Sequence, residues 1–146
     1  MPILLGLCCS TAAAAVWVVD TQDEGIDVAP GDGTCADASA RCSLRAAIME
    51  SNAHAGADEV WLRVGEDSYR PDMSHPDTDS AAVGDVDIHA DLVLRRHPLD
   101  AARISEIAKL NDTFTTPNRI FDIHPPARVY MSDAVVAFGR LSAPDS

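Results

Sequence analysis

A run of aspartates in the middle of this 146-residue chain is the group that could bind a metal ion. Carboxylate oxygens are the ligands that Ca²⁺ prefers in proteins. The run lacks both the order of an EF-hand loop and the Gly-Gly-x-Gly-x-Asp repeat. A solvated acidic loop is therefore the simpler interpretation, calcium is the alternative, and no other cofactor is indicated. The candidate ligands are Asp72, Asp77, Asp79, Asp85 and Asp87.

No catalytic residues are predicted. The five histidines are scattered and share no ligand spacing, and there is no Gly-x-Ser-x-Gly elbow. His89 and His124 each lie at the end of a segment in which apolar and polar residues alternate, and this favours surface positions for both. Arg95 and Arg96 could face an anionic polysaccharide, but a basic pair at a strand end is usually solvated. The other three histidines are His54, His75 and His97.

The N-terminal segment resembles a secretory signal peptide over residues 1–15. Residues 3–9 are apolar, and residues 13–15 satisfy the small-x-small cleavage rule. No segment reaches the ~18 apolar residues that a membrane span requires. We therefore expect a secreted, periplasmic or cell-surface protein without a transmembrane segment.

Two cysteines lie close together downstream of this segment, Cys35 and Cys42. A disulfide is their default state in an oxidising compartment. A zinc site needs four ligands, and no histidine neighbours the pair in sequence. A redox role would favour a Cys-x-x-Cys spacing. The spacing therefore predicts a structural disulfide.

The charge balance is strongly acidic, with 23 Asp and Glu residues against 11 Lys and Arg residues. Such a surface repels phosphate backbones, which argues against nucleic acid as a partner. A solvated acidic face is the simplest interpretation.

One helix is predicted over residues 44–54. Leu44, Ala47 and Ile48 fall on one face at helical spacing, and Ser43 is placed to cap the free amides. We expect Leu44 and Ile48 to be buried and Glu50 to lie on the surface.

Short strands account for the rest of the pattern. Residues 16–20 are β-branched and aromatic, and the apolar side chains of residues 58–64 alternate between two faces, so both ranges are predicted to be strands. Residues 65–83 are predicted to form a loop. Further apolar runs at intervals of roughly 10–16 residues fit the coils of a solenoid, although a β-sandwich would show similar spacing. These runs lie near residues 86–88, 92–94, 104–107, 120–123, 129–131 and 135–138.

Residues 42–48 read Cys-Ser-Leu-Arg-Ala-Ala-Ile and are followed by Ser-Asn-Ala at 51–53. This motif resembles the CSLREA-type domain, a module of secreted bacterial proteins that usually precedes a right-handed parallel β-helix of the pectate-lyase-like class. Residues 84–88 and 118–123 resemble later segments of that family, so the resemblance covers about residues 16–141. The family's Glu is Ala46 here, which removes one half of a capping box.

The resemblance implies a mainly β fold, the first few coils of a right-handed parallel β-helix with a short N-terminal capping helix. Its implied organisation is a signal peptide (1–15), a capping region (16–65), and an acidic loop with initial coils (66–146). The chain stops after a few coils, so we expect it to be truncated and its partner to be the rest of a longer β-helix protein. The implied structural residues are Cys35, Cys42, Ser43, Leu44, Arg45, Ile48 and Asn52.

Two functions follow from the resemblance. The first is a non-catalytic exported module that caps and starts a parallel β-helix, with its long face left for adhesion or carbohydrate contact. The alternative is the N-terminal part of a polysaccharide lyase or glycoside hydrolase, whose catalytic residues would lie on later coils. The fold alone does not make the chain an enzyme.

Overall fold

The computed structural model describes residues 13–63, 69, 80–100, 105–108 and 120–137. Most of the predicted signal peptide and of the loop over 65–83 lies outside these residues. Four of the residues singled out in the sequence lie outside them as well. They are Asp72, His75, Asp77 and Asp79.

The described residues form one short helix and eight strands. The helix begins at Leu44 and ends at Ala53, close to the predicted 44–54, and the strands match the predicted apolar runs to within a few residues. In chain order the elements are β1 (Val16–Val19), α1 (Leu44–Ala53), β2 (Asp58–Leu62), β3 (Val86–Ile88), β4 (Leu92–Arg96), β5 (Ser105–Ala108), β6 (Phe121–Ile123), β7 (Val129–Ser132) and β8 (Ala134–Ala137).

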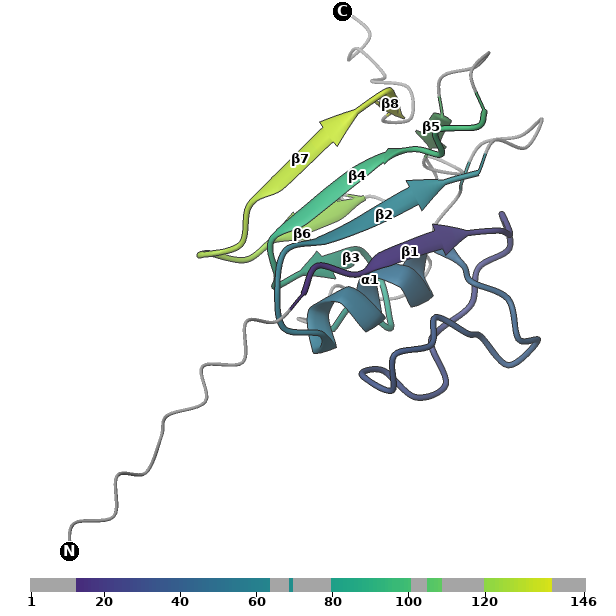
Figure 1. Cartoon of the computed structure of the whole chain (residues 1–146), viewed down its shortest axis with the longest axis vertical. Coiled ribbons are helices and arrows are strands. Elements are labelled where there is room, and N and C mark those ends of the chain that lie inside the picture. Colours follow the sequence, from purple (N-terminus) through teal and green to yellow (C-terminus); the bar gives the residue numbers. More distant parts are fainter. Residues whose placement is uncertain (1–12, 64–68, 70–79, 101–104, 109–119, 138–146) are drawn as a thin grey trace, which may run out of the picture.

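All strand pairs in the described part of the chain are parallel, and they make three sheets with the orders β1-β2-β4-β7, β3-β6 and β5-β8. We call β3, β4 and β5 the first triplet and β6, β7 and β8 the second triplet. Each strand of the first triplet pairs with its counterpart in the second, so the triplets stack on one another (Figure 1). β-Sandwiches are built from antiparallel sheets, and the parallel pairing therefore argues against that alternative.

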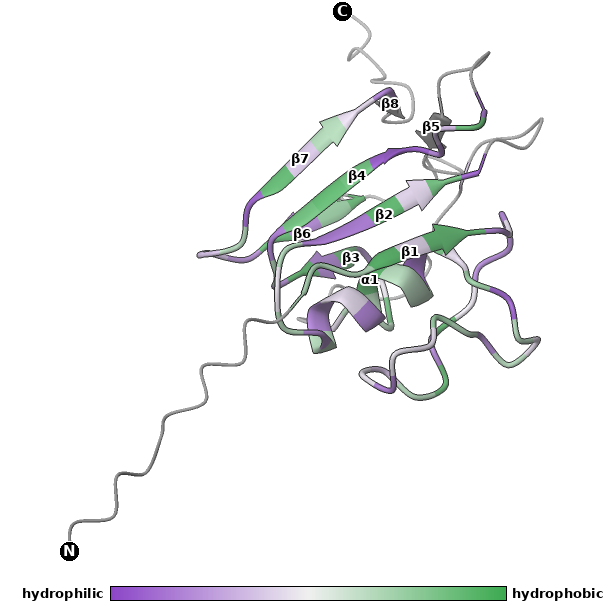
Figure 2. Cartoon of the chain, in the orientation of Figure 1, coloured by the Kyte–Doolittle hydropathy of each residue, from purple (hydrophilic) through white to green (hydrophobic). Residues whose placement is uncertain are grey.

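Alternation along the strands explains the core of the largest sheet. In β2, Val60 and Leu62 are buried while Glu59 and Trp61 face outward, and β4 repeats this pattern. Because the pairing is parallel and in register, Val60 lies beside Leu94, and apolar residues stack on apolar residues from strand to strand. Figure 2 shows the apolar positions of β1, β4 and β7 along the sheet.

Helix α1 lies at the end of the stack that holds β1 and β3, and it contacts β1, β2 and β3 (Figure 1). Leu44 and Ile48 are both buried in the core, as predicted from the helical spacing. The helix is covered on more than one side, because Arg45 and Ala46, which lie off the face of Leu44, Ala47 and Ile48, are also buried. The helix is thus part of the core rather than a surface element.

Candidate functional site

The start of α1 is fixed by Ser43 and by the predicted disulfide. The Ala46 amide donates to Ser43 Oγ over 2.9 Å, so Ser43 caps the helix without a Glu at position 46. Cys35 and Cys42 form a disulfide with their Cα atoms 5.1 Å apart, which confirms the predicted pairing. The Cys42 amide also donates to Asp20 Oδ1, which ties this segment to the end of β1.

Arg45 carries a buried positive charge, with its side chain only 2% exposed. Its guanidinium forms an ion pair with Glu24 and donates to the carbonyls of Ala81 (2.6 Å) and Gly84 (2.7 Å). These carbonyls belong to the segment that leads into β3. Arg45 therefore connects three separate parts of the chain, and its donors are used by protein oxygens rather than turned to a ligand.

Glu50 is fully buried, so its expected surface position is wrong. Its carboxylate accepts hydrogen bonds from the amides of Gly31 (2.5 Å) and Gly33 (2.6 Å). Both glycines have positive φ angles, +94° and +84°, which let the loop turn its amides toward the helix. A buried carboxylate is tolerated here because charged hydrogen bonds replace its lost hydration. Sequence periodicity placed Glu50 off the apolar face, but that side of α1 is covered by the loop.

Asn52 links the end of α1 to the end of β3. Its Nδ2 donates to the Asp87 carbonyl, and its Oδ1 accepts from the His89 amide, each over 2.8 Å. The side-chain amide thereby binds the backbone on both sides of Ile88, as the backbone of a neighbouring strand would. This contact holds the end of β3 beside the end of α1.

Several other acids are buried rather than solvated, which corrects the interpretation of the charge as only a solvated face. Asp27 accepts the amides of Ala29 and Ala36. Asp58, which is fully buried, accepts the Ala15 amide and lies 2.9 Å from His54 Nδ1. These carboxylates organise loops that have little secondary structure of their own.

Tyr69 belongs to the same core and donates its hydroxyl to the Arg63 carbonyl. Burial raises the pKa of its hydroxyl well above the ordinary value, and the negative charges of Asp100 and Asp20 add to that effect. Tyr69 therefore stays protonated and serves as a donor at neutral pH.

The calcium candidates that the structure describes are Asp85, just before β3, and Asp87, within β3. Both are buried rather than held in a solvated loop. With Asp72, Asp77 and Asp79 outside the described residues, calcium binding stays a prediction. Asp87 instead lies beside His89 and His124, which sequence spacing did not connect. A repeated Asp-Ile-His tripeptide, at 87–89 and 122–124, was the signal that could have found this cluster.

Arg95 lies on the outward face of β4, where it contacts β2. Its guanidinium lies 2.7 Å from Glu59 and 5.0 Å from the ring centre of Trp61. Both contacts hold the Arg95 side chain against the neighbouring strand of the sheet. Arg95 is therefore not the freely solvated cation that the dipeptide suggested.

Comparison with known proteins gives no match. No protein-family model matches the chain, and no curated protein and no solved structure is significantly similar to it. The resemblance to the CSLREA-type family therefore rests on the motifs in the sequence. Among the described residues, none of the helical structure is long and apolar enough to cross a membrane.

Proposed function

We propose that this chain is a non-catalytic exported module that caps and starts a right-handed parallel β-helix in a secreted or cell-surface protein. The observation that carries the proposal is the stacking of two strand triplets with α1 at one end (Figure 1). In a parallel β-helix each coil contributes one strand to each of three sheets, and the paired triplets fit that scheme. Parallel crossovers are right-handed in nearly all proteins, which supports the hand.

The polar contacts of α1 support a capping role. The first coil of a β-helix has backbone groups and apolar side chains that no earlier coil covers, and such edges recruit other chains. Leu44 and Ile48 cover apolar side chains at this end. Arg45 binds backbone carbonyls just before β3, and Asn52 binds one within it. The helix thus supplies the contacts that a preceding coil would make.

The opposite end of the stack supports the proposed partner, which is the rest of a longer β-helix protein. β6, β7 and β8 are each the outermost described strand of their sheet. The Leu92 amide donates to the Arg128 carbonyl, so the alternation of a parallel ladder directs the amides of Val129 and Met131 away from β4. Further coils of a longer β-helix would pair at these positions.

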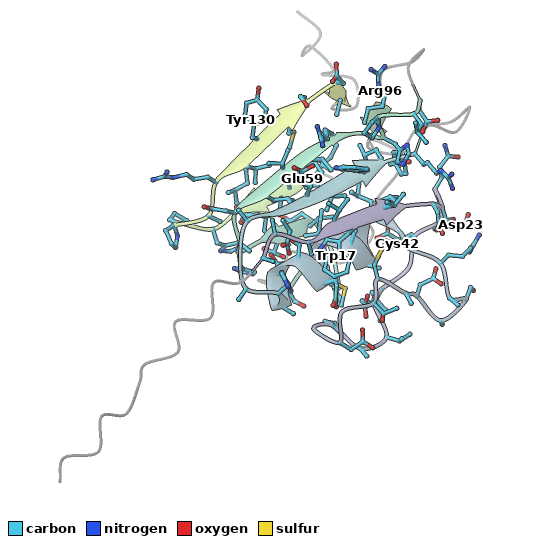
Figure 3. All side chains as sticks on the ribbon, in the orientation of Figure 1. Trp17, Asp23, Cys42, Glu59, Arg96 and Tyr130 are labelled. Atoms are coloured by element: carbon cyan, nitrogen blue, oxygen red, sulfur yellow. A yellow bond between two sulfur atoms is a disulfide. The ribbon has the colours of Figure 1, made fainter. Side chains whose placement is uncertain are left out.

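The outward face of the largest sheet supports the proposed adhesion or carbohydrate contact. Trp61 lies on this face, as the alternation of β2 shows. Tyr130 on β7 is 67% exposed (Figure 3). Aromatic rings with a polar edge suit contact with sugars, because one part is apolar and the other forms hydrogen bonds. The unaltered chain should be retained on insoluble polysaccharides, and Tyr130→Ala should lose this retention. Val16→Ala, which alters an exposed aliphatic residue, should keep it.

Export is supported by the disulfide, which is typical of oxidising compartments. The direct test fuses residues 1–15 to a reporter enzyme that is active only outside the cytoplasm. Activity of this fusion, and none from a fusion with Leu4→Arg and Leu5→Arg, is expected. An inactive fusion of the unaltered segment would contradict the export proposal.

The β-helix itself is tested by inserting a second copy of residues 86–120 after Ile120. A stack of coils accommodates one more coil, because β3 of the copy pairs with β3 and its far edge pairs with β6. The inserted chain should unfold cooperatively in urea with a larger m-value, since more surface becomes buried. The same insertion with its residue order reversed is the control.

Equal loss of structure in both insertions would contradict the β-helix. It would show that the triplets form a closed arrangement with no room for a further coil. Circular dichroism and urea unfolding of the two chains distinguish these outcomes.

A further inference from the structure

The tripeptide Asp-Ile-His occurs twice in this chain, at residues 87–89 and 122–124. The two copies lie on paired strands, because β3 and β6 are parallel with Asp87 beside Asp122 and Ile88 beside Ile123. The His124 amide donates to the Ile88 carbonyl, so the parallel pairing of the two strands extends to the histidines. The fold therefore places two aspartates and two histidines side by side.

The side chains of this group converge. The rings of His89 and His124 stack with their centres 4.2 Å apart. His124 Nε2 lies 2.6 Å from Asp87 Oδ1 and 3.8 Å from Asp122 Oδ2. One ligand atom each from Asp87, His89 and His124 lies within 4.8 Å of the others. Two nitrogens and one carboxylate oxygen thus lie close enough together to share one ion.

Asp87 is the least expected member, because its side chain is only 1% exposed. Its Oδ2 is buried and has no hydrogen-bond partner among the described residues. A second carboxylate, that of Asp122, lies on the neighbouring strand, and like charges directly opposite in a sheet are destabilising. A buried carboxylate oxygen without a partner, next to another carboxylate, favours a cation at this place.

The group is held in place and open to solvent. Asn52 binds the backbone on both sides of Ile88, through the Asp87 carbonyl and the His89 amide. His89 is exposed and His124 is 26% exposed, so an ion can reach the imidazoles from solution. A fixed backbone with accessible ligands is what a metal site requires.

We infer that Asp87, His89 and His124 form a binding site for a divalent transition-metal ion, represented by Zn²⁺. Imidazole nitrogens select such ions over Ca²⁺ and Mg²⁺, which prefer oxygen ligands alone. Metal bonds of about 2.0–2.1 Å separate two tetrahedral ligand atoms by about 3.3 Å, so the Asp87–His124 contact needs to open by under 1 Å. The nearby Asp122 charge, together with that of Asp87, balances the double positive charge of the ion.

The test is calorimetric titration of the full, untagged chain with Zn²⁺, in a Cys8→Ser, Cys9→Ser background that removes the thiols of the N-terminal segment. One ion per chain is expected. His89→Ala and His124→Ala should each weaken binding at least about tenfold, and Asp122→Asn should weaken it less. His97→Ala is the matched control, since His97 also lies near an aspartate, Asp100, at 3.9 Å.

A second measurement keeps the outcome clear if a variant is unstable. Co²⁺ bound to the chain should give weak visible bands without the intense near-ultraviolet band of thiolate ligation, and His89→Phe, which keeps a ring for stacking, should abolish them. No binding by the unaltered cluster would overturn the site. Equal affinities of the unaltered chain and His89→Ala, with both folded by circular dichroism, would overturn it as well.

Discussion

The N-terminal part of the molecule, residues 13–63, and the two strand triplets hold their structure by different means. In the N-terminal part, buried side chains bind distant backbone groups, as Glu50 does for Gly31 and Gly33. In the triplets, each strand residue meets its counterpart on the next strand, as Leu92 meets Val129. A contact of the first kind is made once, whereas a contact of the second kind is repeated. Single substitutions should therefore cost more in the N-terminal part.

The largest effect is expected for Arg45→Met. The variant removes a buried charge and leaves the carbonyls of Ala81 and Gly84 without their donor, which should lower the free energy of unfolding by about 3–5 kcal/mol. Urea unfolding measures this loss. Arg41→Met is the control, because the Arg41–Asp23 ion pair is exposed and should contribute under about 1 kcal/mol. Equal losses would show that the buried contacts of Arg45 matter no more than a surface ion pair.

Glu50→Gln should be the next most damaging change, at about 3 kcal/mol, because the charged hydrogen bonds to two glycine amides are lost and an amide group faces a donor. Glu59→Gln makes the same chemical change on the outward face, where Glu59 pairs with Arg95, and should cost under about 1 kcal/mol. Both values come from urea midpoints. If Glu50→Gln left the free energy of unfolding unchanged, Glu50 would behave as the surface residue that sequence periodicity suggested.

Removing the disulfide by Cys35→Ala with Cys42→Ala should cost about 2.5 kcal/mol, because the short loop gains entropy in the unfolded chain. Protein made under oxidising conditions is compared with its fully reduced form and with Cys8→Ala, Cys9→Ala. The double variant and reduced protein should unfold at the same urea concentration. Unchanged stability on reduction would show that the hydrogen bonds of this segment, such as those of Asp20 and Asp27, hold it without the disulfide.

The smallest effect links the two regions through Tyr69. Its pKa is raised by burial and then by Asp100, which follows β4, and Asp20, which follows β1. The unfolded chain releases this proton near pH 10 while the folded chain keeps it, so stability falls as the pH rises above about 10. The loss should reach about 1 kcal/mol between pH 9 and pH 11. Tyr69→Phe should abolish this loss, whereas Tyr130→Phe, at an exposed ring, should retain it.

Local patterns predicted the elements well. The spacing of Leu44, Ala47 and Ile48 placed the helix, and Ser43 marked its start, because both signals act within a few residues. Alternation likewise placed β2 and β4. The cysteine pair was predicted from spacing and compartment and is bonded in the structure.

The polar contacts could not be predicted in the same way, because they join residues far apart in the chain. Nothing near Glu50 shows that the loop around Gly31 and Gly33 folds back over it. The stacking of His89 on His124 depends on the register of β3 and β6, which only the repeated tripeptide could have indicated.

The division of strands among the sheets has a mechanical consequence. Of the three sheets that the described residues form, only β1-β2-β4-β7 continues from the N-terminal part into the triplets, since β3 and β5 begin the other two. A pulling force along the stack is therefore carried across this boundary by one backbone ladder, between β2 and β4, with side chains such as Asn52 sharing the load beside it. Between the triplets the same force is spread over three ladders. Under tension, the junction of β2 and β4 is the place where the described structure should yield first.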